Sequence, residues 1–269
     1  MGLLFRLFAK KTYEELIREC QRGRKDNVLF LLESLDVQKC SGALRAAAAA
    51  GHAEIVQILL ERSALPDAKS YETTAMGSVG DFSTYESTAL TDAIKGRHYG
   101  VVQVLLKHGA NPNKVRSVGT QAPSFSPIYD AARVGDVRMV KLLLEAGADV
   151  DGRGDSSPLH AAAWKGHLDV AKVLLEAGAN IHRRLKGDWT AHPQPIHMAV
   201  ENGHLSVAEF LLENGADVNA PGSGVNGDKT PLGYVISRMD MDRRYPSISK
   251  GSYPGMEMKA LLNKYGALK

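Results

Sequence analysis

The hydrophobic positions of this chain follow a helical period that repeats many times. Within residues 51–61, for example, apolar residues stand at Ile55, Val56, Leu59 and Leu60, which places them on one face of a helix. Segments with the same pattern occupy residues 23–33, 51–61, 97–107, 135–145, 166–176 and 203–213. The sequence therefore predicts a set of similar amphipathic helices spread over most of its length.

Each of these segments is preceded by a second, shorter apolar pattern. An apolar residue stands seven positions before each segment and opens a small helix, as in the alanine-rich run 159–164. These opening residues are Leu16, Leu44, Leu90, Ile128, Leu159 and Ile196. A glycine that follows four of the longer helices marks their ends, since glycine adopts the left-handed conformation of a helix C-terminus without steric cost. The repeated unit is therefore a helix–turn–helix followed by an extended turn.

The opening motif of two units gives the repeat a family resemblance. Ser157-Pro-Leu-His-Ala-Ala162 and Gln194-Pro-Ile-His-Met-Ala199 resemble the Thr-Pro-Leu-His-x-Ala signature of the ankyrin repeat, which has a period of about 33 residues. The resemblance implies an all-α ankyrin-repeat solenoid with lengthened finger loops between repeats. It covers residues 12–269 with seven repeats, of which the terminal ones are degenerate: 12–39, 40–68, 87–113, 126–151, 157–182, 194–219 and 229–269. It also implies that His52, His167 and His204 bond backbone groups in neighbouring turns.

The spacing between repeats is uneven. Equivalent positions lie 46 residues apart between 51 and 97, 38 between 97 and 135, and 37 between 166 and 203. The excess over about 33 residues predicts insertions at 69–86, 114–125 and 183–193, with another at 240–255 inside the last repeat. Long loops on a rigid scaffold commonly carry function.

Composition and charge exclude several other classes. No run approaches the ~18 apolar residues of a membrane span, and two cysteines among 269 residues predict a reducing, cytoplasmic or nuclear location. A net charge of +3 without a concentrated basic face makes nucleic acid an unexpected partner. No motif for a cofactor or metal is present, and a monomer is expected. The extension at residues 1–11 is apolar and basic but lacks the order of a signal peptide. It either packs over the first helices or touches a membrane surface.

Positions two, five and six residues after each opening residue are expected to face the groove of the stack. In the second repeat these are Ala46, Ala49 and Ala50, and in the third Asp92, Lys95 and Gly96. In the next two repeats they include Asp130, Arg133, Trp164 and Lys165, and in the last two Met198, Tyr234 and Arg238. Together with Trp189 on a finger, the aromatic positions form a candidate apolar anchor, since binding hot spots concentrate at aromatic and arginine residues. Asp92–Lys95 and Asp130–Arg133 form acid–base pairs one helical turn apart.

Two classes of function remain. The leading prediction is a non-catalytic protein–protein interaction module, a scaffold or adaptor that binds a peptide or protein through its groove and fingers. The alternative is a small-molecule binder or unusual enzyme that uses Asp92 and Asp130 beneath the inserted loops. The sequence contains no phosphate loop, nucleophile elbow or dinucleotide fingerprint, which favours the first class without excluding the second.

Overall fold

The computed structural model describes residues 2–36, 40–68, 70–75, 82–117, 124–153, 157–185, 194–224, 227–228, 230–244 and 253–268. By internal contacts it divides into two compact units. Unit 1 comprises residues 1–130 and 142–148, and unit 2 comprises residues 131–141 and 149–269. Each unit is described by itself below.

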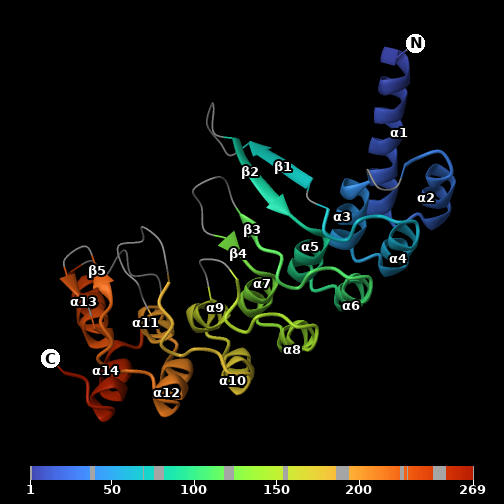
Figure 1. The fold of residues 1–269 in the computed structure, drawn as a ribbon. Coiled ribbons are helices and arrows are strands. Elements are labelled where there is room, and N and C mark those ends of the chain that lie inside the picture. Colours follow the sequence, from blue (N-terminus) through green and yellow to red (C-terminus); the bar gives the residue numbers. More distant parts are fainter. Residues whose placement is uncertain are drawn as a thin grey trace. The chain divides into compact units, whose positions relative to one another are not determined.

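Unit 1 stacks helical hairpins in two layers (Figure 1). Its helices are α1 (Gly2–Arg22), α2 (Lys25–Leu32), α3 (Ser41–Ala50), α4 (Ala53–Glu61), α5 (Ala89–Lys95) and α6 (Tyr99–Lys107). The first helices α1, α3 and α5 contact one another in sequence order, and the second helices α2, α4 and α6 do the same. Helices α7 (Pro127–Val134) and α8 (Val137–Glu145) contribute residues to both units.

Unit 2 repeats this arrangement. Its helices are α9 (Pro158–Lys165), α10 (Leu168–Glu176), α11 (Pro195–Glu201), α12 (Leu205–Glu213), α13 (Pro231–Arg244) and α14 (Gly255–Lys264). First helices α9, α11 and α13 pack in one layer, and second helices α10, α12 and α14 in the other. The repeated apolar positions form the core between the layers: Val170, Leu174, Val207 and Leu211 are all buried. Each large aliphatic side chain buried in this way contributes about 1.5–3 kcal/mol.

The predicted insertions in unit 1 form β-hairpins at the finger positions. Strands β1 (Ser70–Ala75) and β2 (Phe82–Ser87) pair antiparallel, with Ser70 opposite Ser87 and Ala75 opposite Phe82. The next finger carries β3 (Arg116–Ser117) and β4 (Ser124–Phe125), and β2 contacts β3. Unit 2 contains one further short hairpin, β5 (Ser223–Gly224) with β6 (Gly227–Asp228). These hairpins are the exception to an otherwise helical fold.

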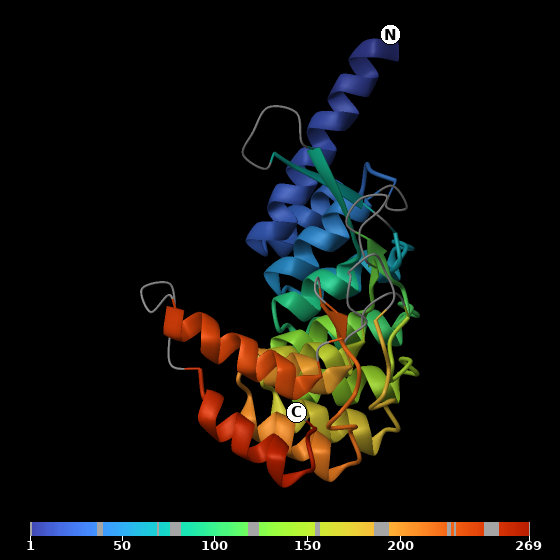
Figure 2. The same cartoon turned by 90° about the vertical axis from the view of Figure 1, so that its left-hand side faces the viewer.

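Two predicted boundaries fall inside helices. Helix α1 runs unbroken from Gly2 to Arg22, so the boundary expected at residue 12 has no counterpart in the backbone, and the helix runs beyond α2 and α3 (Figure 1, Figure 2). After Gly2, no glycine or proline interrupts the segment before Gly23. Helix α13 likewise extends to Arg244, so the first residues of the insertion predicted at 240–255 are helical. Both differences arise because helices continue until a breaking residue ends them.

Candidate functional site

A histidine at the start of four second helices, α4, α6, α10 and α12, fixes the end of the first helix one repeat earlier. The Nε2–H groups donate to backbone carbonyls one repeat earlier: His52 to Gln21 (3.1 Å), His98 to Ala49 (2.9 Å), His167 to Arg133 (3.2 Å) and His204 to Trp164 (2.9 Å). The predicted backbone bonds of His52, His167 and His204 are confirmed. All four carbonyls belong to residues five positions after the opening apolar residue. These four histidine bonds, called the histidine lock below, therefore fix the backbone of residues that are expected to face the groove.

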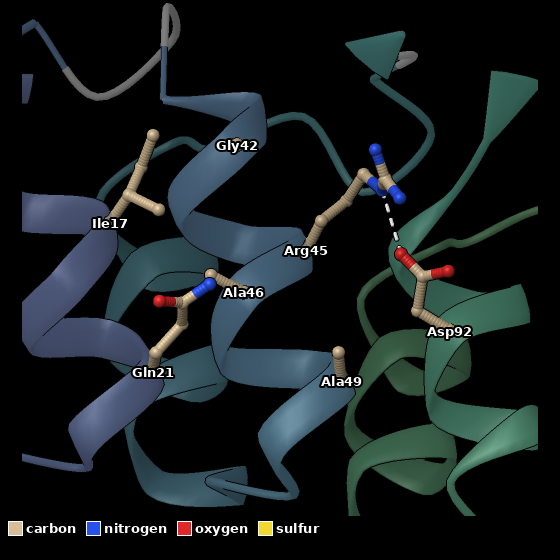
Figure 3. Close-up of a pocket in the computed structure, with 7 residues that line it drawn as sticks. All are labelled: Ile17, Gln21, Gly42, Arg45, Ala46, Ala49 and Asp92. Atoms are coloured by element: carbon tan, nitrogen blue, oxygen red, sulfur yellow. Dashed lines mark hydrogen bonds and ion pairs between the residues drawn. The ribbon is translucent and has the colours of Figure 1, made fainter. Parts of the chain in front are cut away.

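The groove of unit 1 contains a hollow of about 350 Å³ between α1, α3 and α5 (Figure 3). Its lining combines small and apolar residues with three polar ones: Ile17, Gln21, Gly42, Arg45, Ala46, Ala49 and Asp92. Ala46, Ala49 and Asp92 are among the positions that the sequence placed at the groove. The alanines and Gly42 make room for the hollow because they carry almost no side chain.

Asp92 is held by partners that sequence reasoning missed. Arg45 Nε donates to its Oδ2 at 2.7 Å (Figure 3), and Ser87 Oγ donates to its Oδ1 at 2.6 Å. The side chains of Arg45 and Asp92 are 6% and 13% exposed, so the pair is largely shielded from water. Arg45 lies in the preceding repeat, 47 residues away. Lys95 is exposed on the same helix as Asp92.

Asp130 lies inside unit 1 instead of on its surface. Its side chain has no exposed area, and Arg116 of β3 donates from Nε and Nη2 to its two carboxylate oxygens at 2.8 and 2.7 Å. The guanidinium of Arg116 also lies 4.7 Å from the ring centroid of Phe125, whose ring contacts Tyr129. Burial acts to lower the pKa of Arg116, but its hydrogen bond and charge interaction with Asp130 outweigh this and raise it. Asp130 therefore anchors the β3–β4 finger to α7.

The two carboxylates of the enzymatic alternative thus have separate arginine partners. Asp92 pairs with Arg45, and Asp130 pairs with Arg116. General acid–base work needs carboxylates positioned toward a substrate. The hollow is lined by Asp92, whereas Asp130 is not among its lining residues. This geometry gives both carboxylates a clear structural role.

In unit 2, the predicted anchor residues lie on three successive first helices. Trp164, at the end of α9, is 41% exposed, and Lys165 Nζ lies 4.0 Å from its ring centroid. Met198 of α11 is half-buried. Tyr234 of α13 is also half-buried, and its ring meets the His197 ring edge-on with centroids 5.9 Å apart. Arg238 is exposed beside Asp242, Arg133 is half-buried on α7, and Trp189 lies outside the described residues.

Tyr253 is a structural residue that the sequence did not reveal. Its hydroxyl donates to the Val200 carbonyl at 2.7 Å, and the adjoining Pro254 packs against Gly203. In the earlier repeats a histidine ring occupies the corresponding place against Gly23, Gly51, Gly135 and Gly166. Burial raises the pKa of the Tyr253 phenol to about 12, although nearby Arg238 opposes the increase. Tyrosine and proline thus replace histidine where the last repeat joins its neighbour.

Replacing Tyr253 with phenylalanine is expected to lower the free energy of unfolding by about 0.5–1.5 kcal/mol. The substitution removes the hydroxyl and leaves the Val200 carbonyl without that donor, while the ring still packs on Gly203. Urea denaturation of both proteins measures the change. Tyr265→Phe is the control, since no hydrogen bond is recorded for its hydroxyl within the described part of the chain. Equal effects of the two substitutions would contradict the bridging role of Tyr253.

The stacked hairpins, the histidine lock and the finger loops define a repeat protein of the helix–turn–helix kind. Models for ankyrin repeats (3 copies) match residues 16–116 and 118–184, and models for ankyrin repeats (many copies) match residues 159–212 and 196–243. The chain belongs to the ankyrin-repeat family, as its sequence motifs predicted. Within the described residues, no helix has both the length and the apolar character needed to cross a membrane.

Two similar proteins agree with this assignment. The ankyrin repeat protein FPV014 of fowlpox virus (strain NVSL) is 32% identical over 101 residues, which are 38% of this chain and 19% of that protein. The chain therefore spans only a small part of this relative's length. The crystal structure of the human ASB11 ankyrin repeat domain has a TM-score of 0.66 and 21% identity, and the match covers 94% of this chain and 98% of that one. This second likeness establishes the fold alone.

Proposed function

We propose that this chain is a non-catalytic protein-interaction module that binds a peptide or protein partner through the groove of its first helices and its finger loops. Ankyrin repeats are in general protein-binding modules. Fold by itself does not define function, so the argument rests on specific surface residues. The proposed contacts are those predicted from the sequence, while Asp130 serves by holding the β3–β4 finger through Arg116.

The observation that carries the proposal is the exposed ring of Trp164. Residues Pro158 to Ala163 of α9 are buried, so α9 already packs against the core without the Trp164 ring. The histidine lock fixes the Trp164 backbone, because His204 bonds its carbonyl. An indole held at a groove position by rigid backbone loses little conformational entropy when it is covered by a partner. Tryptophan is also the residue type most enriched at binding hot spots.

Basic residues on α7, α9 and α13 supply the proposed polar rim. Lys165 lies over the indole face, Arg133 is on α7, the first helix before α9, and Arg238 is on α13, two first helices after it. Rim charges steer association and select partners more than they add affinity. The proposal places the apolar contact at Trp164, Met198 and Tyr234, with selectivity coming from the basic rim and from the charged residues of unit 1.

The proposed setting is a reducing compartment, the cytoplasm or nucleus, where the chain acts as a monomer. Cys20 and Cys40 are both buried free thiols, and burial raises their pKa values to about 12 and 11. Such thiols stay protonated and react slowly. Contact of residues 1–11 with a membrane surface stays a prediction, because the side chains of this segment lie outside the described residues.

Replacing Trp164 with alanine is expected to reduce recovery of specific partners at least tenfold, in line with the roughly 2 kcal/mol or more of a hot-spot residue. The measurement is quantitative affinity purification from cells with tagged wild-type and variant chains. Phe30→Ala is the matched control: Phe30 is also aromatic and 73% exposed, but it belongs to second helix α2. Equal thermal unfolding of all three proteins verifies folding. Unchanged recovery with Trp164→Ala, or equal loss with Phe30→Ala, would refute the proposal.

A further inference from the structure

The hollow in unit 1 has a lining that defines what it accepts. We infer that it is an anchor pocket for one uncharged apolar side chain, carried by an extended segment of the partner protein. This inference rests on the proposed protein-binding function and adds a second contact to the one at Trp164. The argument uses the size of the hollow, the charge state of its lining and the polar group at its edge.

The hollow is large enough to accept a partner side chain. The hollow of about 350 Å³ lies at the small end of the roughly 300–1,000 Å³ found for ligand pockets. Ile17 on α1 lies beside Gly42 and Ala46 on α3, so apolar groups form the side between these two helices, while Ala49 lies on the side of α3 toward α5 (Figure 3). A partner residue that replaces water here would bury its own apolar surface together with that of Ile17 and the alanines. This is the driving force expected for an anchor residue.

The charges at the hollow are already balanced. Arg45 and Asp92 bind each other at 2.7 Å while largely shielded from water, and Ser87 also donates to Asp92. A charged occupant would compete with this closed pair and would itself lose hydration. An apolar occupant leaves the pair intact. Charge complementarity therefore selects a neutral side chain over an acidic or basic one.

Gln21 supplies the group that suits a peptide backbone. Its side-chain amide carries both donors and an acceptor, which match the C=O and N–H of an extended segment. Its own backbone carbonyl is bonded by His52, so the residue starts from a fixed position at the edge of the hollow. The hollow thus places the apolar groups of Ile17 and the alanines beside a group that hydrogen-bonds main chain. This combination fits a side chain that arrives on a peptide.

The test is a peptide display selection against the full chain, followed by affinity measurements on two variants that each gain a phenylalanine. Ala49 is exposed at the end of α3 and lines the hollow, whereas Gln57 is exposed on the second helix α4. Ala49→Phe would fill the hollow from its rim and is expected to weaken binding of the selected peptides at least tenfold. Gln57→Phe is expected to change it less than twofold. Ala49→Met would fill less of the hollow than Ala49→Phe. Circular dichroism confirms that each variant is folded.

The identity of the anchor residue tests whether the hollow accepts an apolar or a charged side chain. In an alanine scan of a selected peptide, one Leu, Ile, Met, Phe or Trp should matter for the wild-type chain and lose its effect with Ala49→Phe. An acidic or basic residue in that role would overturn the inference, as would peptides insensitive to Ala49→Phe. Peptides that depend on Trp164 but not on Ala49 would overturn this inference alone. Selection of no peptide that depends on either residue would contradict the proposed function as well.

Discussion

Replacing Arg116 with alanine is expected to lower the free energy of unfolding by about 3–5 kcal/mol. Arg116 supplies two hydrogen bonds to a carboxylate, that of Asp130, which has no exposed area. Without the guanidinium, a buried negative charge would lose the group that compensates it, and the stacking on Phe125 would also be lost. Urea denaturation at neutral pH, followed by circular dichroism, measures the difference. This is the largest single-residue effect expected for unit 1.

A double substitution separates the charge from the packing. If both partners are replaced by apolar residues of similar size, as in Arg116→Met with Asp130→Leu, the stability should recover most of the loss, because no charge remains buried. Arg116→Lys should be intermediate, since lysine keeps the charge but not the two-pronged geometry. A loss below about 1 kcal/mol for Arg116→Ala, the range of an exposed pair, would show that the carboxylate is solvated.

Replacing Gly166 with alanine is expected to destabilise unit 2 by about 2–4 kcal/mol, through backbone strain and overpacking together. Gly166 has a φ of +75°, and an added Cβ would lie 2.6 Å from His204 Nδ1. The ring cannot simply move aside, because its Nε2 is bonded to the Trp164 carbonyl. Thermal and urea denaturation report the loss of stability. Reduced partner recovery should accompany it, since Trp164 belongs to the same lock.

Gly178 provides the matched control for this substitution. Its φ is +89°, but nothing lies within 4 Å of an added Cβ. Gly178→Ala therefore isolates the cost of the left-handed conformation, about 1–2 kcal/mol. The difference between the two variants measures the contact with His204. If Gly166→Ala lowered the free energy of unfolding no more than Gly178→Ala does, the packing of the His204 ring would not require a glycine at position 166.

The repeating frame could be predicted from the sequence because every unit carries the same information. The apolar positions, the glycine stops and the histidines recur at fixed spacing, so each repeat supports the interpretation of the others. The bonds of His52, His167 and His204 to backbone confirm this prediction. The family resemblance predicted that the first helices form the groove; Ala46, Ala49 and Asp92, on first helices α3 and α5, line the hollow.

The charge pairs could not be predicted in the same way. Sequence spacing suggested local partners for Asp92 and Asp130, one helical turn away. The structure adds Arg45, from the preceding repeat, and Arg116, from an insertion. Both contacts depend on how neighbouring repeats and fingers align, which no local pattern contains. Tyr253 was missed for a related reason: it lies within the insertion predicted at 240–255, which hides its correspondence with the histidines of the other repeats.

Hydroxyl-radical footprinting of the chain, alone and bound to a purified partner, tests the central claim most directly. The method reports solvent access at individual side chains, and the two helix layers carry oxidisable residues on separate faces. Binding through the groove predicts strong protection of Trp164, with weaker protection of Met198 and Tyr234, while Phe30 on α2 and Met256 on α14 stay as reactive as in the free chain. Protection of Phe30 and Met256 with Trp164 unchanged would contradict a binding surface on the first helices.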